Sequence, residues 1–398
     1  MNGRIRPSIV AVVCATLIAG CRSQPIRHNL SPLPPVTVSR QTPASQSAAR
    51  SSVGNTVVTS VASLPSAARL NMMSASVGWA VGNGVVWRTV DGGKAWAQVT
   101  PPDVQPTFHL QVAFLNSQTA WAIVPGASAN SGTVVQTVDG GIAWRHVTAH
   151  MFPLYGAPAN STSLSFVDAQ HGWLLLVRGA AAGSEAVDVY RTVDGGMHWA
   201  LSSQTAPNAN VAGELPLYGS KNGIRFLTDR TGWVNGFSAQ PGVAWLYVTH
   251  DGGNAWAAQT LNLPPAFKAS ALHVAPPAAL KGGNVIIPVR ALTSRPLVAF
   301  YSSADGGATW NESGPKPFTA YAFASSNMIW ATDGHQLFRS TDLGSTWSGV
   351  SAKGLDLSKV SQLDFLNANT GWAVVSGKAK AAAQIYRTSD GGRSWERL

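Results

Sequence analysis

The chain has 398 residues, with 39 glycines, 24 prolines and only 12% charged side chains. This composition disfavours long solvated helices, and no apolar run reaches the roughly 20 residues of a membrane-spanning helix. The formal net charge is +10, but residues 1–60 carry six arginines and no acid, so the rest of the chain carries only +4. A body with so little net charge is not expected to bind nucleic acid.

Residues 1–20 are typical of a secretory signal peptide. Arg4 and Arg6 precede an apolar core, residues 9–19, that is too short to span a bilayer. The core runs into Leu17-Ile18-Ala19-Gly20-Cys21, which resembles the lipobox of bacterial lipoproteins. The resemblance implies that Cys21 is acylated and anchors an extracytoplasmic chain to a membrane. The alternative is an ordinary signal peptide that contains a cysteine.

Residues 21–60 are predicted to be a flexible tether. They are rich in serine, proline, threonine, glutamine and alanine, and they lack a periodic apolar pattern. Their four arginines suit attraction to anionic headgroups, although a solvated linker explains them as well. The only other cysteine, Cys14, lies inside the signal, so the mature chain has no pair of thiols for a disulfide.

A phrase of the form Thr/Ser-x-Asp-Gly-Gly-x-x-Trp recurs through the rest of the chain. It occurs seven times, once with Leu343 in place of the first glycine, and we number the repeat units 1 to 7 in chain order. The aspartates of these boxes are Asp91, Asp139, Asp194, Asp251, Asp305, Asp342 and Asp390. The boxes are on average about 50 residues apart, which is the spacing of propeller blades. Asp-Gly between strand-like runs is a strong hairpin signal, so we predict that each box is a structural turn.

Six units carry a second tryptophan upstream of the box. These residues are Trp79, Trp121, Trp173, Trp233, Trp330 and Trp372. Each unit parses as four short strands, which in the last unit are expected at residues 362–366, 371–375, 384–388 and 394–398. The sequence therefore predicts an all-β domain over residues 61–398, a seven-bladed β-propeller of four-stranded blades.

The repeated phrase resembles the Asp-box, or BNR repeat, of bacterial sialidases, sortilin-type receptors and some glucanases. With its Gly-Trp pairs and Arg-Thr-x-Asp-Gly-Gly-x-x-Trp boxes, the region from residue 61 to 398 is similar to the photosystem II assembly and stability factor family. The resemblance implies a propeller in which the box is a structural turn. It also implies a protein partner and no cofactor or metal.

Acid-base candidates are scarce outside the boxes, with seven aspartates and four glutamates left over. A sialidase needs an arginine cluster with a Tyr/Glu pair, and a glucanase needs two facing carboxylates. Arg88, Arg191, Arg339 and Arg387 each lie three residues before a box aspartate, so the repeat accounts for them without a substrate. We expect no catalytic residue and no enzymatic activity, with a glycosidase as the alternative.

Long, unequal connections between units leave from the strand ends opposite the boxes. Their aromatic and basic residues are predicted to form the partner-binding surface: Tyr155, Tyr218, Lys221, Phe267, Lys268, Lys316 and Phe318. The alternative is that these rings pack against the neighbouring blade. Two functions stay open. One is a monomeric, membrane-tethered scaffold that assists assembly of a membrane protein complex; the other is a cell-surface propeller that binds or hydrolyses glycans.

Lipidation gives the first testable prediction. Cys21→Ser removes the thiol that receives the lipid, so it should abolish incorporation of labelled fatty acid and release the protein from the membrane fraction. Cys14→Ser is the matched control and should change neither. Fatty-acid labelling or firm membrane association of the Cys21→Ser protein would contradict the prediction.

Overall fold

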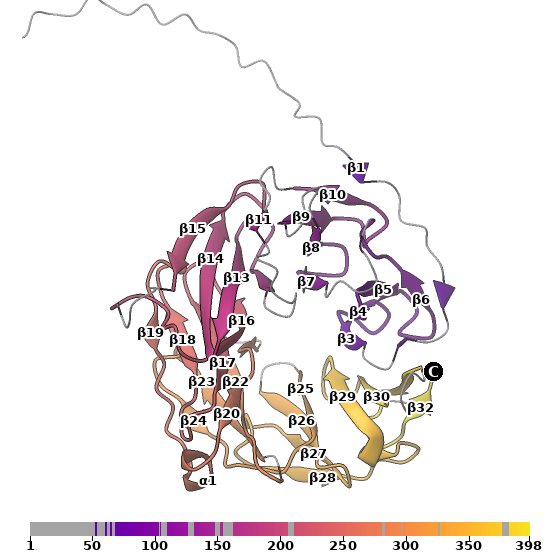
Figure 1. The fold of residues 1–398 in the computed structure, drawn as a ribbon. Coiled ribbons are helices and arrows are strands. Elements are labelled where there is room, and N and C mark those ends of the chain that lie inside the picture. The colour runs from indigo at the N-terminus through magenta and orange to yellow at the C-terminus, as the bar shows by residue number, and fades with distance from the viewer. Residues whose placement is uncertain are drawn as a thin grey trace, which may run out of the picture. The chain divides into compact units, whose positions relative to one another are not determined.

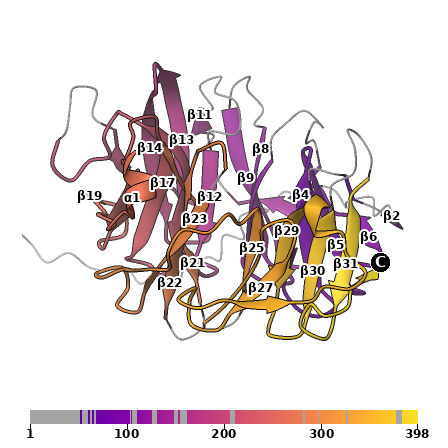
Figure 2. The ribbon, with the colours of Figure 1, turned by 90° about the horizontal axis from the view of Figure 1, so that it is seen from below.

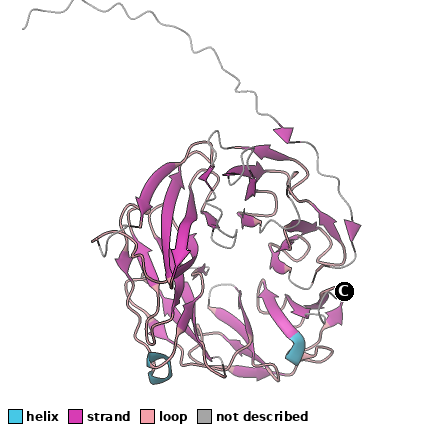
Figure 3. Cartoon of the chain, in the orientation of Figure 1, coloured by secondary structure: helices cyan, strands magenta, loops and turns pink. Residues whose placement is uncertain are grey.

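The computed structural model describes residues 52–53, 60–61, 64–65, 68–102, 104, 110–125, 131–147, 152–153, 162–205, 211–280, 283–295, 297–324, 327–375 and 382–398. Almost all of the regular structure is β-strand, with one short helix and one 3-10 turn in the described part (Figure 3). No helix in these ranges is long and apolar enough to cross a membrane.

Each repeat unit forms antiparallel strands joined through its box. Unit 1 contains β3 (Arg69–Met72), β4 (Gly78–Gly82), β5 (Val85–Thr89) and β6 (Trp96–Gln98). Unit 2 contains β7 (Gln111–Phe114), β8 (Ala120–Pro125), β9 (Ser131–Thr137), β10 (Trp144–His146) and β11 (Phe152–Pro153). Unit 3 contains β12 (Thr162–Phe166), β13 (Gly172–Ala181), β14 (Ser184–Thr192) and β15 (Ala200–Gln204).

The same pattern continues toward the C-terminus. Unit 4 contains β16 (Ser220–Phe226), β17 (Gly232–Ser238), β18 (Leu246–Thr249) and β19 (Ala257–Ala258). Unit 5 contains α1 (Pro265–Lys268), β20 (Leu272–Val274), β21 (Ala278–Ala279), β22 (Val285–Ala291), β23 (Leu297–Ser303) and β24 (Asn311–Glu312). Unit 6 contains β25 (Ala320–Ala324), β26 (Met328–Thr332), β27 (Leu337–Ser340) and β28 (Ser348–Val350). Unit 7 contains the 3-10 turn Leu357–Lys359, β29 (Val360–Phe365), β30 (Gly371–Val375), β31 (Gln384–Thr388) and β32 (Glu396–Arg397).

The all-β propeller fold is confirmed: antiparallel sheets stand side by side around a common centre (Figure 1). Within the described ranges the strands pair into six sheets, because β20 pairs with both β17 and β22 and so joins units 4 and 5 into one sheet. The number of blades therefore stays a prediction. The strands expected in unit 7 agree with those observed to within two residues at each end.

Two short strands precede unit 1, inside or at the end of the predicted tether. The strand β1 (Ser52–Val53) pairs with β10 at the outer edge of unit 2, and β2 (Ser60–Val61) pairs with β6 at the outer edge of unit 1. The Ala383 N–H then donates to the Leu64 carbonyl at 2.7 Å, which links this segment to unit 7. The boundary expected at residue 60 is therefore too late, because backbone pairing on the propeller begins by Ser52.

Each box is a turn whose polar groups hydrogen-bond to one another. In unit 1 the Thr89 hydroxyl donates to Asp91 Oδ1 at 2.8 Å and accepts from the Gly93 N–H at 2.9 Å, while the Ala95 N–H donates to Asp91 Oδ1 at 3.0 Å. The other six boxes repeat these bonds. Gly92 and Gly93 have φ of +80° and +98°, which explains the pair of glycines.

The residue before the box tryptophan varies, and the structure explains the variation. Thr309, Thr346 and Ser394 donate a second, hydroxyl bond to the box carboxylate, whereas the alanines in units 1, 2 and 4 give only the backbone bond. The Ser394 hydroxyl, with the backbone N–H groups of its turn, lowers the pKa of Asp390 to about 2. The box carboxylates are thus held as hydrogen-bonded anions inside their turns.

Upstream tryptophans of units 2, 3 and 7 tie their units to the next around the ring. The indole N–H groups of Trp121 and Trp173 donate to the box carbonyls of Gly195 and Gly252 in the following units, at 2.9 and 2.8 Å. Each ring also stacks on the phenylalanine that ends the next unit's first strand; Trp173 lies 3.6 Å from Phe226 between ring centroids. The indole of Trp372 in the last unit donates to a box carbonyl of the first unit, that of Gly92, at 2.8 Å. This bond closes the ring.

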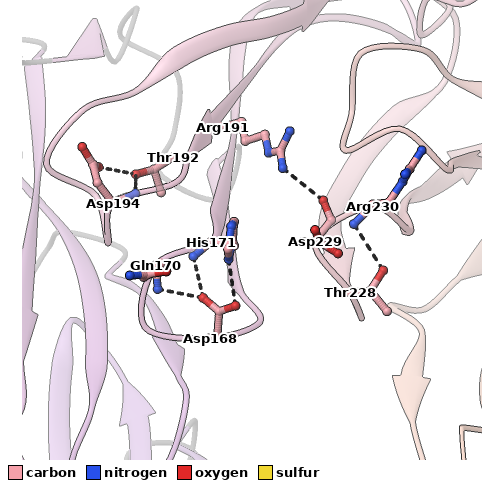
Figure 4. A network of polar contacts seen from close by, with 9 residues as sticks. All are labelled: Asp168, Gln170, His171, Arg191, Thr192, Asp194, Thr228, Asp229 and Arg230. Carbon is pink, nitrogen blue, oxygen red and sulfur yellow. Dashed lines mark hydrogen bonds and ion pairs between the residues drawn. The ribbon is translucent and has the colours of Figure 1, made fainter.

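Repeat arginines reinforce the same contact. The Arg191 guanidinium lies 5.7 Å from the centroid of the Trp173 ring and donates to the Asp229 carbonyl of unit 4 at 3.3 Å (Figure 4). Arg88 makes the equivalent contacts with Trp79 and with the Ser117 carbonyl of unit 2. The interpretation that these arginines belong to the repeat is therefore confirmed by their contacts.

Ring closure gives the second prediction. Trp372→Phe keeps an aromatic ring but leaves the Gly92 carbonyl without its donor. The free energy of unfolding, measured in denaturant, should therefore fall by about 1 to 3 kcal/mol. Trp330→Phe is the matched control, since Trp330 is equally buried but its indole nitrogen has no hydrogen-bond partner among the described residues. Equal destabilisation of the two variants would show that the bond to Gly92 contributes nothing to closure.

Candidate functional site

The candidate site is the channel enclosed by the first strands of the units. Strands β7, β12 and β16 lie side by side, as do β25, β29 and β3 (Figures 1 and 2). A cavity of about 570 Å³ is lined by β3, β7 and two residues of the next first strands, Thr162 and Asn222. A second cavity of about 330 Å³ is lined by β21, β25 and β29. Leu70 lines both, so the two cavities adjoin at this residue of β3.

The strand register places several side chains at the end of the channel remote from the boxes, which we call the distal end. In unit 1, Met72 is level with the box residue Thr89 through their common partner in β4, whereas Arg69 begins the strand at the other end. The same reasoning puts Arg290 and Tyr321 at the distal end of units 5 and 6. The distal end therefore presents cationic and aromatic side chains.

Arg69 and Arg290, from units 1 and 5, lie near enough to Tyr321 of unit 6 for their charges to act on its phenol. Burial raises the pKa of the Tyr321 phenol, and the charges of Arg290 and Arg69 both oppose the rise. His273 pairs with Arg290 across β20 and β22. Burial lowers the pKa of His273, and the Arg290 charge lowers it further. Neither arginine takes part in an ion pair with any described residue.

A third arginine, Arg225, lies in the first strand of unit 4. Arg225 is one residue from the box end of β16 and is exposed to solvent, yet burial among protein atoms lowers its pKa. A side chain that is both wet and surrounded is typical of a narrow aqueous channel. Like the distal pair, Arg225 forms no ion pair with the described residues.

Asp364 is the only carboxylate among the described residues that line the two cavities. Burial raises its pKa to about 6, and the Met72 N–H, which donates to Oδ2 at 2.7 Å, opposes the rise. Gln362 accepts from the Leu70 N–H at 2.9 Å and donates to the Leu70 carbonyl at 2.6 Å. These side chains pair with the free edge of β3, so they are structural groups of ring closure.

The described lining of the two cavities holds one carboxylate, which is already bonded to backbone, whereas glycoside hydrolysis uses two that face each other across the substrate. No cluster of three or more metal-ligating side chains occurs among the described residues. What the channel does offer is cations, amides and an aromatic phenol, which suit binding.

The predicted partner-binding residues are not brought together as expected. Phe267 is fully buried in the core of units 4 and 5, and Phe318 is buried among the rings of units 5 and 6. That prediction is wrong for both residues, because each connection folds back far enough for its ring to enter a core. Lys268 and Lys316 are exposed, and Tyr155 lies outside the described residues.

The prediction for Lys221 is also wrong, because the side chain is buried and bonded within the protein rather than available to a partner. Its ammonium donates to four carbonyl oxygens, those of Glu185, Leu217 and Gly219 at 2.8 Å and that of Tyr218 at 3.1 Å. Burial lowers its pKa to about 8. Lys221 thereby holds the loop that carries Tyr218, the one predicted aromatic seen to be exposed, whose hydroxyl bonds that of Tyr247 at 2.9 Å.

Sequence reasoning missed the channel arginines. Arg69, Arg225 and Arg290 lie inside strands, outside the boxes and outside the long connections where binding residues were sought. A usable signal existed: a charged side chain in the first or second strand of a unit, where most positions are small or apolar, has no place in the core.

No protein-family model matches the sequence, and no curated protein matches it. The fold is similar to solved structures. One is YCF48 bound to a D1 peptide, with TM-score 0.52, 17% identity, and coverage of 86% of this chain and 99% of that one. Another is the GH74 xyloglucanase from Xanthomonas campestris, with TM-score 0.56, 16% identity, and coverage of 85% of this chain and 55% of that one. At such identities the likeness establishes the propeller fold and nothing finer.

Proposed function

We propose that this protein is a non-catalytic binding propeller, anchored outside the cytoplasm by a lipid at Cys21, that holds an acidic segment of a protein partner at the distal end of its channel. The partner is proposed to belong to a membrane protein complex whose assembly or stability the propeller assists. One observation carries the proposal. The register places Arg69, Arg290 and Tyr321 at the distal end, the charges of both arginines act on Tyr321, and neither arginine has an acidic partner among the described residues.

Unpaired cations in a confined site favour an anionic ligand for a physical reason. Arg290 is half-buried, so a carboxylate that reaches its guanidinium gains more than it would in bulk solvent, whereas Arg69 is exposed and adds charge at the entrance. The fixed fork of donors on each arginine suits carboxylates, and Tyr321 adds an aromatic surface. An extended peptide with acidic side chains meets all of these groups at once.

The similar propeller YCF48 has been solved with a D1 peptide bound. That complex supports a peptide segment as the class of ligand. The experiment below identifies the partner of this chain. The xyloglucanase, by its name, acts on a glycan. A glycan ligand is the other outcome of the experiment, and an acidic glycan would use the same arginines.

The third prediction tests the channel. Arg69→Ala with Arg290→Ala removes two charges from the distal end, so the protein recovered with the propeller from cross-linked membranes should fall about tenfold or more. Quantitative mass spectrometry measures the recovery. Arg397→Ala, which removes an exposed charge from the outer strand β32, is the control and should leave recovery unchanged.

Three outcomes are distinguishable. Loss of one protein with the double variant alone supports the proposal. Recovery of a saccharide in place of a protein would favour the glycan function. Equal recovery of the same protein with wild type and double variant, at unchanged melting temperature, would place the binding surface away from the channel.

A further inference from the structure

The box turns of units 1, 2 and 3 expose apolar side chains. The exposed fractions are 62% for Val90, 51% for Val138, 54% for Ile142, 58% for Val193 and 42% for Met197. These residues occupy two positions of the box, the one before the aspartate and the one after the glycine pair. Half or more of each valine or isoleucine side chain therefore faces solvent at the same level of three successive units.

The box itself does not require apolar residues at these positions. The equivalent pairs in the other four units are His250 and Asn254, Ala304 and Ala308, Thr341 and Ser345, and Ser389 and Arg393. Their boxes form the same hydrogen bonds, so polar or small residues fold equally well there. Folding of the turn therefore does not explain why these positions are mostly apolar in units 1 to 3 and polar or small in units 4 to 7.

The exposed residues are also not scattered singly. Single apolar side chains at a surface are ordinary, but a set restricted to neighbouring units and to one face marks a surface that contacts something apolar. Arg88 of unit 1 packs against the first box glycine of unit 2, Gly140, so the box turns of neighbouring units are adjacent. We call the five residues of units 1 to 3 the apolar box arc.

We propose that the apolar box arc rests on the lipid bilayer to which the chain is anchored. The point at which the N-terminal segment joins the propeller supports the bilayer as the contact. The strand β1 attaches it to the outer edge of unit 2, the middle unit of the three. The proposal rests on the proposed membrane anchoring, and it adds which face of the propeller meets the lipid.

The geometry allows this contact. About 30 residues separate Cys21 from β1, and a flexible chain of that length spans roughly 30 Å, enough to reach either face of the propeller. Tether length therefore does not select a face, whereas the distribution of exposed apolar side chains does. Lys94, which holds the equivalent position beside the arc in unit 1, adds one cation, and the tether adds four arginines, all suited to anionic headgroups. The box carboxylates nearby are already bonded within their turns.

The contact would orient the propeller. With the box turns of units 1 to 3 against the headgroups, the distal end of the channel points away from the bilayer. A segment of a neighbouring membrane protein that projects from the same membrane would then meet the channel from the aqueous side. Shallow contact of short side chains, rather than deep insertion, is expected from valine, isoleucine and methionine in rigid turns.

The fourth prediction uses a fluorescent label at a single cysteine. Residues 22–398 contain no cysteine, so in a protein that begins at residue 22 Val138→Cys and Thr341→Cys each offer one site. The two residues hold the same box position in units 2 and 6, and both are exposed. Each protein carries an N-terminal histidine tag and is attached to phosphatidylethanolamine–phosphatidylglycerol vesicles that contain nickel-chelating lipid. The tag replaces the lipid anchor, so the result does not depend on acylation of Cys21.

Nitroxide-labelled lipid reports the contact. The label at position 138 should be quenched at least about twofold more than the label at position 341, with emission shifted to shorter wavelength. Equal quenching at the two positions, high or low, would overturn the proposal. Failure of the Cys21→Ser test, in contrast, would remove the natural anchor and leave this result standing.

Discussion

The indole N–H bond from one unit to a box carbonyl of the next, which Trp121, Trp173 and Trp372 make, is the contact on which the closed arrangement depends most. Trp372 shows this best, because its bond to Gly92 joins residues from opposite ends of the propeller and so links the last unit to the first. In a repeat array each unit is stabilised by its neighbours, and here the upstream tryptophan of one unit packs on the next. Stacking of Trp121 on Phe166 and of Trp173 on Phe226 adds apolar area to a contact that the hydrogen bond orients.

This contact has a consequence for function. The Gly92 carbonyl of one box accepts a hydrogen bond from the Trp372 indole, and the Asp390 carboxylate accepts hydrogen bonds within its own turn. The repeat arginine Arg387 lies over the Trp372 ring. The polar residues that recur in the sequence are thus engaged inside the propeller. A ligand must therefore bind to side chains that are not already bonded within the repeat. Arg69, Arg225 and Arg290 are such groups, because they interrupt otherwise small or apolar strands and lack ion-pair partners among the described residues.

The sequence was sufficient for the fold because its signals are local. A Thr-x-Asp-Gly-Gly turn determines its own hydrogen bonds, and the strands around it follow from apolar runs. The site was predicted less well because burial of a loop residue depends on distant partners: Phe267 and Phe318 look like surface aromatics until the connection that carries them folds onto a core. Lys221 misled for the same reason, since its four carbonyl acceptors come from a loop and from a neighbouring strand that no spacing rule brings together.

The central claim is that the boxes hold the propeller together while the distal end of the channel binds the partner. Site-specific photocross-linking in the producing cells tests it most directly, with a photoreactive amino acid placed at Asn222, exposed at the distal end of the channel, or at Ser389, exposed in the box of unit 7. The account predicts a protein adduct from position 222 and none from position 389. An adduct from position 389 alone would contradict it.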